Sequence, residues 1–471
     1  MTTHTYQPAT GAAVARQGTS ALAALLLRLH FYIGLFVGPF ILVAAVTGTL
    51  FVLTPQIEER IYADQLFNRS QGEVQALAAQ VKAAQAYLAG RGESPRLFAV
   101  RPSKGEGWNT RVMFSQPGLG DQSRAVFVDP VSLQVKGELL VYGTSGTLPL
   151  RTTLDYLHRN LMLGDLGRNY SELAASWLWL GALGGVWLWW SARRRTRAQA
   201  HKVRRPVSAR RLHSLLGIWI VVGLVFFSAT GLTWSKWAGA RVNMLRAELG
   251  WITPSASMQL QPAAPMAGMD MGEHAEHMAH LHAGMAMPMP MPMIGDPARF
   301  DLVQGIARAG GIDASEIEIR PPRGENQAWM VREVDRSWPT QVDTVAVDPE
   351  RMAITSRADF ATFPLIAKLI RWGVDAHMGI LFGVANQILM AAFGIALTAM
   401  IVLGYVMWWR RRPAAGSGLA PLSEAFMRLP PAQRASVGVL AILLGWNLPL
   451  MGVSLLLFLL LDVIRWRLAR R

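Results

Sequence analysis

The chain has 471 residues, 51% of them hydrophobic and 16% charged, with a mean hydropathy of +0.24, which excludes an ordinary soluble domain and indicates a membrane protein. The net charge of +15 does not indicate a nucleic-acid partner, because the arginines cluster at the ends of apolar stretches. The absence of cysteine excludes disulfides, thiolate metal sites and C-x-x-C-H haem attachment, so histidine or methionine alone would hold any haem.

Five apolar stretches are long enough to compare with the ~20 residues that a helix needs to cross ~30 Å of hydrocarbon. They are residues 31–53, 173–190, 212–234, 386–409 and 436–464. The first is too long for a cleavable signal peptide and predicts a signal anchor that ends at Thr54-Pro55. Arginine clusters beside the later stretches predict that the N-terminus and the two basic loops are cytoplasmic and that the long polar segments lie outside.

Each long polar segment is predicted to fold as a small α+β domain. In the first segment, a helix is expected at Gln75–Leu88, and strands are expected at Leu97–Arg101, Arg111–Phe114, Ala125–Val128 and Leu133–Lys136. In the second, a helix is expected at Phe300–Ala309, and strands are expected at Glu316–Arg320, Gln327–Val331 and Thr344–Val347.

The chain is a tandem duplication. Arg28-Leu29-His30 and Gly34 recur 183 residues later as Arg211-Leu212-His213 and Gly217, and the register holds to Thr47-Gly48 and Thr230-Gly231. A second offset of 219 residues relates a further set of positions. These are His158, Gly164, Gly185, Trp189-Trp190 and Arg101-Pro102, matched by His377, Gly383, Gly404, Trp408-Trp409 and Arg320-Pro321.

The expected fold is a transmembrane helical bundle of four core spans in two tandem repeats, plus a C-terminal hydrophobic segment, with two small α+β domains outside. In chain order, we expect a disordered N-terminus (1–20), span 1 (21–53), outer domain 1 (54–157), span 2 with its lead-in (158–190), a basic loop (191–211), span 3 (212–234), outer domain 2 (235–376), span 4 with its lead-in (377–409), a cytoplasmic loop (410–435), a kinked span or re-entrant hairpin (436–464) and a basic tail (465–471).

Four histidines occupy repeated positions and are candidate cofactor ligands. Because duplicated halves pack around a pseudo-two-fold axis, His30 is expected to oppose His213 near the cytoplasmic face, and His158 is expected to oppose His377 near the outer face. Two opposed neutral imidazoles suit a six-coordinate haem b, which transfers electrons because no axial position is left for O₂. The sequence therefore predicts one or two haems. The alternative is that these are ordinary interfacial histidines.

Glycines and arginines near these histidines are candidates for contact with the haem. Gly34, Gly217, Gly164 and Gly383 lack side chains that would hold a flat macrocycle away from the helix. Arg28, Arg211, Arg159 and Arg168 are candidates to pair with its propionates. Close helix packing and positive-inside topology are the alternative explanations.

The second polar segment carries an insertion. The two repeat offsets differ by 36 residues, and residues 258–293 form a low-complexity tract with ten methionines and four histidines, which predicts a mobile loop. Thioethers and imidazoles together suit Cu(I). The candidate copper ligands are His274, His277, His280, His282, Met269, Met271, Met278 and Met285. The alternative is a tolerated insertion without function.

No phosphate-binding glycine loop is present, so the electron donor is expected to be a quinol or a separate flavoprotein.

The ordered set of Arg28-Leu29-His30 with Gly34 and Thr47-Gly48, an α+β domain, and His158 with Gly164 leading to Trp189-Trp190, resembles the PepSY-associated transmembrane family, in two copies. The resemblance implies an iron-regulated bacterial inner-membrane protein with PepSY-like domains in the periplasm. Haem-containing ferric-siderophore reductases are the best-understood members, and carrying their ligands over implies His30, His158, His213 and His377. The Met/His tract is not a general feature of the family.

Together these observations predict a haem b reductase that passes electrons across the inner membrane to a periplasmic metal, Fe(III) in a siderophore before others. A first alternative is a copper-handling membrane protein that uses the Met/His tract at 258–293. A second is a PepSY-type regulator of periplasmic proteases, which would leave the four repeated histidines unexplained.

Overall fold

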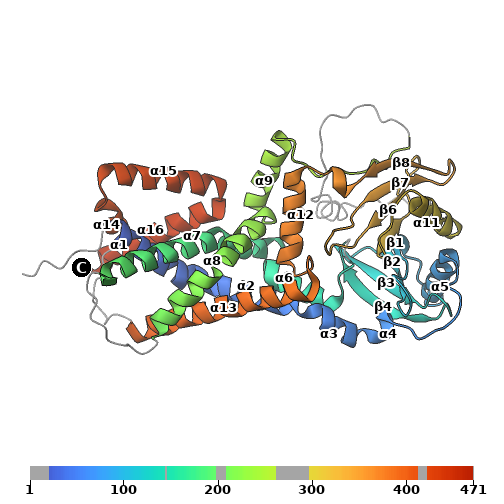
Figure 1. The fold of residues 1–471 in the computed structure, drawn as a ribbon, viewed down its shortest axis with the longest axis horizontal. Coiled ribbons are helices and arrows are strands. Elements are labelled where there is room, and N and C mark those ends of the chain that lie inside the picture. The colour runs from blue at the N-terminus through green and yellow to red at the C-terminus, as the bar shows by residue number, and fades with distance from the viewer. Residues whose placement is uncertain (1–20, 144–145, 198–207, 261–295, 412–421, 470–471) are drawn as a thin grey trace, which may run out of the picture.

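The computed structural model describes residues 21–143, 146–197, 208–260, 296–411 and 422–469. A helical bundle forms one end of the elongated molecule and a sheet domain forms the other, with helices between them (Figure 1). We call the end of the bundle next to the sheet the sheet side, and the opposite end the far side.

Five of the described helices are long and apolar enough to cross a membrane, and four of them coincide with the four predicted core spans, whereas the fifth covers only the second part of the stretch predicted at 436–464. The five helices are Ala21–Val52, Gly164–Arg194, Ala209–Thr233, Gly383–Arg410 and Pro449–Leu468. The first comprises α1 (Ala21–Tyr32), a π-helical turn η1 (Ile33–Val37) and α2 (Gly38–Val52), and the next three lie in α7 (Gly164–Arg197), α8 (Ala209–Thr233) and α13 (Gly383–Arg411).

The first four spans form a closed ring, in which α2 packs on α7 and α13, and α8 packs on the same two helices. Small residues allow the close crossings, since a Cβ on Gly223 would lie 2.5 Å from the Phe393 ring and one on Gly394 would lie 2.0 Å from Thr49 Oγ1. The π-helical turn leaves carbonyls without their usual partners, and the Tyr405 hydroxyl donates to Gly34 O at 3.0 Å.

The chain stays helical beyond the first span. Helix α3 (Thr54–Ile61) follows α2 after a break at Leu53, and α4 (Ala63–Leu66) comes next. Thr54-Pro55 is therefore a junction between helices and not the end of helical structure as expected. Pro55 is tolerated because it falls in the first turn of α3, where its missing N–H would have no partner.

The C-terminal segment forms α14 (Leu422–Met427) and a hairpin of α15 (Pro431–Asn447) and α16 (Pro449–Ala469). At the apex the two arms touch, since a Cβ on Gly445 would lie 3.1 Å from the Cα of Gly452. Helix α16 is fastened to the ring by Trp177 Nε1, which donates to Ser454 Oγ at 2.8 Å, and by the Tyr32 hydroxyl, which donates to Asp462.

The two polar segments form one antiparallel sheet of eight strands in the order β4-β3-β2-β1-β5-β6-β7-β8. The strands are β1 (Arg96–Arg101), β2 (Thr110–Ser115), β3 (Gln122–Val128), β4 (Val135–Tyr142), β5 (Ile317–Arg320), β6 (Trp329–Glu333), β7 (Thr344–Asp348) and β8 (Ala353–Ala358). The expectation of two separate domains is corrected here, because β1 pairs with β5 through Val100 and Ile319. Pairing removes two edges that would otherwise expose backbone N–H and C=O groups.

Helices α5 (Leu77–Ala89) and α11 (Phe300–Ala309) cover one face of this sheet, and their apolar sides share one core. Asp301 at the start of α11 accepts hydrogen bonds from Leu77 N and Ala78 N, which stabilises the N-terminus of α5 and ties the halves together. The short helix η2 (Pro297–Arg299) precedes α11.

The other face of the sheet is turned toward the bundle (Figure 1). Helix α6 (Pro149–Asn160) leads from β4 into α7, α9 (Trp237–Glu248) follows α8, and η3 (Phe360–Thr362) with α12 (Leu365–His377) leads into α13. The chain thus passes between sheet and bundle on short helices, and two of these carry His158 and His377.

Candidate functional site

The structure brings the four repeated histidines together as two facing pairs. On the far side, His30 of α1 and His213 of α8 have ring centroids 6.2 Å apart and ring planes at 87°. On the sheet side, His158 of α6 and His377 of α12 have centroids 6.2 Å apart and planes at 69°. All four rings are half-buried.

In the far-side pair, helix carbonyls bind Nδ1 of each ring. His30 Nδ1 donates to Gly181 O at 3.1 Å, and His213 Nδ1 donates to Met400 O at 2.8 Å. The two acceptors are themselves 219 residues apart, so the contact is repeated with the duplication. A carbonyl can only accept a hydrogen bond, so Nδ1 carries the proton and Nε2 of the neutral ring keeps its lone pair.

In the sheet-side pair, threonines take this role. The Thr47 hydroxyl donates to Val43 O at 2.7 Å and the Thr230 hydroxyl donates to Phe226 O at 2.8 Å. Each threonine oxygen is therefore left to accept from imidazole Nδ1, that of His158 at 3.2 Å and that of His377 at 2.6 Å. His158 Nδ1 also lies 3.0 Å from Ala44 O.

Glycines give the rings room, but they are not the predicted ones. A Cβ on Gly185 would lie 3.2 Å from His30 Cε1, and a Cβ on Gly48 would lie 3.1 Å from His158 Cε1. Likewise, a Cβ on Gly404 would lie 3.8 Å from His213 Cε1. All of these glycines and both threonines occupy matched positions of the two repeats. This matching was the signal in the sequence that could have identified them.

The four predicted glycines have varied surroundings. Gly164 and Gly383 have φ values of +57° and +56° at the starts of α7 and α13, so the turn itself requires glycine there. Gly34 has no atom within 4 Å of its would-be Cβ, and Gly217 faces Met400 Sδ at 3.3 Å. A role in haem clearance stays a prediction for all four.

The four predicted arginines lie near the pairs but differ in their contacts. Arg28 and Arg211 precede His30 and His213 by two residues on the same helices; the first is half-buried and the second exposed. On the sheet side, Arg159 forms an ion pair with Asp155 at 3.7 Å, and Arg168 donates to Trp234 O at 3.2 Å. Propionate binding stays a prediction for them.

The geometry of each pair fits a haem. With a metal–nitrogen bond of about 2 Å and about 1.1 Å from nitrogen to ring centre, two axial imidazoles have centroids about 6.3 Å apart. A direct edge-to-face contact of two rings gives a similar separation, so the hydrogen bonds of each ring are considered beside the distance. Within the described residues no hydrogen bond engages Nε2 of any of the four rings, whereas Nδ1 is bound in each case, as is usual for metal-bound histidine.

A metal ion bound by protein side chains alone fits less well. The described part of the chain contains no group of three or more His, Cys, Asp or Glu side chains that could hold one. A haem brings four nitrogens of its own and needs two protein ligands, which is the number that each pair offers.

The two pairs lie at different depths of the bundle. His30 and Thr47 are 17 residues apart on the first span, as are His213 and Thr230 on α8. At 1.5 Å per helical residue this separation is about 26 Å along the bundle. One pair is thus near the far side and the other is next to the sheet domain.

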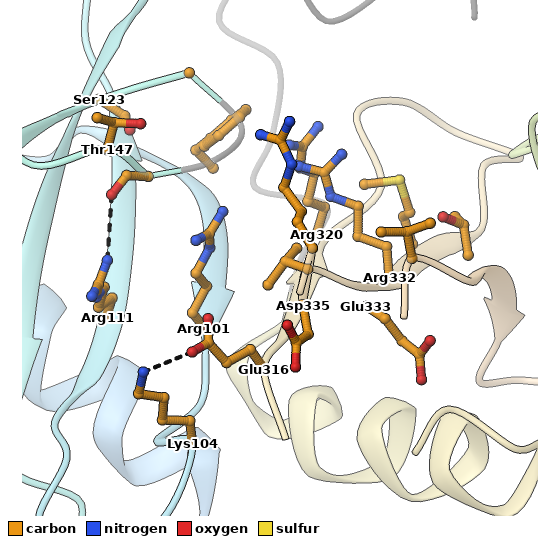
Figure 2. A pocket seen from close by; sticks show the side chains of 18 of the residues that line it. Arg101, Lys104, Arg111, Ser123, Thr147, Glu316, Arg320, Arg332, Glu333 and Asp335 are labelled. Atoms are coloured by element: carbon orange, nitrogen blue, oxygen red, sulfur yellow. Dashed lines mark hydrogen bonds and ion pairs between the residues drawn. The ribbon is translucent and has the colours of Figure 1, made fainter. Parts of the chain in front are cut away.

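A cavity of about 1060 Å³ lies between the sheet and the sheet side of the bundle. Its lining includes Arg101, Arg111, Arg320 and Arg332 from four adjacent strands, and Figure 2 shows side chains from both halves of the sheet around it. Met378 and Gly379, which follow His377 directly, line it from the bundle. From the sequence Arg101 and Arg320 were identified only as a repeated pair, because the sheet pairing that brings them together cannot be read from one strand.

The candidate copper ligands at His274, His277, His280, His282, Met269, Met271, Met278 and Met285 lie outside the described residues. The described start of the tract runs beside the residues that precede β6, where Gln259 pairs with Gln327, and Met258 lines the cavity.

Comparison with curated proteins found no match. The family described as the PepSY-associated TM region matches residues 27–411, which contain all four repeated histidines, the ring of four spans and the whole sheet. This match extends over most of the sequence and confirms the resemblance drawn from the repeated motifs. The chain therefore belongs to the PepSY-associated TM region family.

Proposed function

We propose that this protein is a haem b-containing inner-membrane reductase that passes electrons across the bilayer to a metal chelate on the sheet side. The observation that carries the proposal is the repeated geometry of the two histidine pairs, with centroids 6.2 Å apart in each and Nδ1 bound to the protein in all four rings.

His30 and His213 would hold one haem, and His158 and His377 a second, and haem in such sites supplies one-electron transfer with both axial positions filled. The protein's contribution is orientation. The bonds to Nδ1 fix the orientation of each ring and leave Nε2 to bind the haem iron, and the missing side chains at Gly48 and Gly185 leave room for the rings. The spans around the sites pack through a shared apolar core.

The charges at the two ends of the bundle support a cytoplasmic far side. Arg193, Arg194 and Arg410 lie at the far-side ends of α7 and α13, and Arg210 and Arg211 lie at the start of α8 (Figure 1). Basic residues at span ends mark the cytoplasmic face, so the sheet domain would lie in the periplasm.

The substrate we favour is Fe(III) in a siderophore. One electron converts Fe(III) to Fe(II), which oxygen-donor chelators hold less tightly, so reduction releases the iron. A quinol that is oxidised to a quinone gives up two electrons and two protons and reduces two ferric ions; a flavoprotein is the other class of donor. The electron enters near His30 and His213 and leaves beside His377.

The test is an absorption spectrum of the detergent-purified protein, oxidised and dithionite-reduced, with pyridine haemochrome quantification. We expect a low-spin b-type spectrum and about two haems per chain. A protein purified from haem-replete cells without haem would refute the proposal.

The hydroxyl of Thr230 should matter for the sheet-side site. Thr230→Val keeps the shape but removes the acceptor of the 2.6 Å bond from His377 Nδ1, so haem affinity there should fall by about 10–100-fold. Thr47→Val should lower haem affinity less, since His158 Nδ1 also has Ala44 O as an acceptor. The measurement is haem transfer to apomyoglobin from each variant.

Thr233→Val is the matched control, because its exposed hydroxyl bonds only Ala229 O of its own helix. Equal haem retention in Thr230→Val and Thr233→Val would contradict an orienting role for Thr230.

A further inference from the structure

We propose that the cavity between sheet and bundle binds a polyanionic, carboxylate-bearing metal chelate and holds it against the sheet-side histidine pair. The binding is argued from the cavity alone, and only the reduction of the bound chelate rests on the proposed function.

The cavity is basic. Its lining contains ten arginine and lysine side chains against six aspartate and glutamate side chains. Some of the acids are already committed, since Glu333 accepts backbone N–H bonds from Asp313 and Ala314, and Glu316 forms an ion pair with Lys104 at 2.7 Å. The remaining positive charge favours an anion.

The arginines stand in a row across the middle of the sheet. Arg101 is directly opposite Arg111 on β2. Since Val100 pairs with Ile319, Arg101 also faces Glu318 on β5, and Glu318 in turn is opposite Arg332 on β6. All of these side chains therefore lie on one face of the sheet, opposite the face whose valines and isoleucines pack in the core under α5 and α11.

One buried carboxylate forms ion pairs with three arginines of the cavity wall. Glu318 has no exposed side-chain surface, and it lies 2.7 Å from Arg101, 2.6 Å from Arg320 and 3.2 Å from Arg332. A single negative charge fixes three guanidinium groups in place and leaves the cluster positive. Such preordered guanidinium groups are suited to bidentate binding of carboxylates.

The bundle side of the cavity repeats this arrangement. Asp375, also fully buried, accepts from Arg336 Nε at 2.6 Å and lies 3.3 Å from Arg371 Nε, so two guanidinium groups share one carboxylate. Arg151 of α6 stands over the Phe51 ring at 4.5 Å. Arg151 and Arg371 are on the helices that carry His158 and His377 in their last turns, about two turns before these histidines, so an anion held by them would lie on the same side of the bundle as that pair.

The protonation behaviour of the arginines agrees with a crowded cationic site. Burial, together with the neighbouring charge of Arg101, lowers the pKa of Arg111 to about 10. Burial lowers the pKa of Arg320 and that of Arg151 to about 10 as well. All three remain charged at neutral pH, and a bound anion would relieve the strain of this crowding.

The size and position of the cavity favour a chelate over a simple anion. A volume of about 1060 Å³ is slightly above the ~300–1,000 Å³ typical of small-molecule sites. Phe98, Trp108 and Met378 add apolar surface that inorganic phosphate cannot use. Met378 and Gly379 belong to its wall, so the cavity reaches the residue that directly follows His377.

The experiment is calorimetric titration of the full-length protein in nanodiscs with ferric citrate, iron-free citrate, inorganic phosphate and ferrioxamine, a cationic hydroxamate chelate. We expect ferric citrate to bind most tightly. Equal affinity for ferrioxamine would overturn the charge argument, and equal affinity for iron-free citrate or phosphate would show an anion site that does not recognise a chelate.

Two variants test the arginines. Arg111→Gln removes a cation that does not contact Glu318, and Arg332→Gln removes the most distant of its three partners, so Arg101 and Arg320 still compensate that carboxylate. Each should weaken ferric citrate binding by about tenfold. Arg299→Gln makes the same charge change outside the cavity, at an exposed ion pair with Glu350, and should leave binding unchanged.

Thermal unfolding and the haem spectrum of each variant report whether it is folded. Unchanged ferric citrate binding in folded Arg111→Gln and Arg332→Gln would overturn the proposal. Its failure is distinct from failure of the proposed function: a haem protein that binds no chelate refutes only the cavity site, whereas a haem-free protein that binds ferric citrate refutes only the reductase.

Discussion

Alanine in place of His377 is expected to remove one of about two haems per chain and to end electron delivery to a chelate on the sheet side. The ring of His377 lies 6.2 Å from that of His158, and loss of either imidazole leaves a single axial ligand in that site. The measurement is pyridine haemochrome quantification together with the rate of Fe(II) formation, trapped by ferrozine.

Double variants assign the pairs. His158→Ala with His377→Ala should retain as much haem as either single variant, because both belong to one site, whereas His30→Ala with His377→Ala should retain none. His201→Ala is a suitable control, since His201 has no counterpart in the repeat. If His158→Ala and His30→Ala together behave as one site, the pairing argued here is wrong.

Glutamine in place of Glu318 is expected to destabilise the sheet domain by about 3–5 kcal/mol, the cost of removing one partner from a buried ion cluster. The side chain of Glu318 is fully buried between Arg101, Arg320 and Arg332, and without its charge the three guanidinium groups repel each other across the β1–β5 junction. Thermal unfolding followed by tryptophan fluorescence measures the loss, because Trp329 lies on the adjacent strand β6.

The same cluster predicts a pH dependence. Burial by itself would raise the pKa of Glu318, but Arg320, with Arg332 and Arg101, holds the pKa far below its usual range. A carboxylate with a depressed pKa in the folded state contributes stability above its unfolded pKa of about 4.3, and this contribution is lost as the pH falls below that value. The wild-type protein should therefore lose stability between about pH 4.5 and pH 2, and Glu318→Gln should lose less.

Glu350→Gln is the matched control for both measurements. Its side chain is 71% exposed and pairs with Arg299 on the surface of the same domain, where an ion pair contributes about 0–1 kcal/mol. Equal unfolding temperatures for the Glu318 and Glu350 variants would contradict the structural role of the buried cluster.

The long apolar helices could be located from the sequence because their signals are local, whereas the shorter helices between sheet and bundle were not predicted. Apolar runs of spanning length predicted four of the five long apolar helices, and the fifth run, 436–464, is divided between α15 and α16. Strands were harder where they form the sheet edges: β4 extends six residues beyond its predicted end, since Gly137 interrupts its pattern, and β8 was not predicted, because Thr355, Ser356 and Arg357 give it a polar sequence.

The facing of the histidines also followed from sequence, through the duplication. The 183- and 219-residue offsets relate His30 to His213 and His158 to His377, and a pseudo-two-fold arrangement of equal halves makes such positions neighbours. What the offsets could not show was which matched residues support the rings. Thr230 contacts His377, and Gly185 lies beside His30, because of the way that separate helices pack against each other. The sequence of one helix does not show this packing.

By itself the sequence determined the membrane spans, the duplication and the four histidines, since each depends on composition or on a repeat that can be read along one chain. Only the tertiary structure decided that the two α+β segments share one sheet and that arginines from both halves meet in one cavity above His377. The physical reason is that the β1–β5 pairing joins residues more than 200 positions apart, and its register, which sets the row from Arg111 to Arg332, exists only once those strands are hydrogen-bonded.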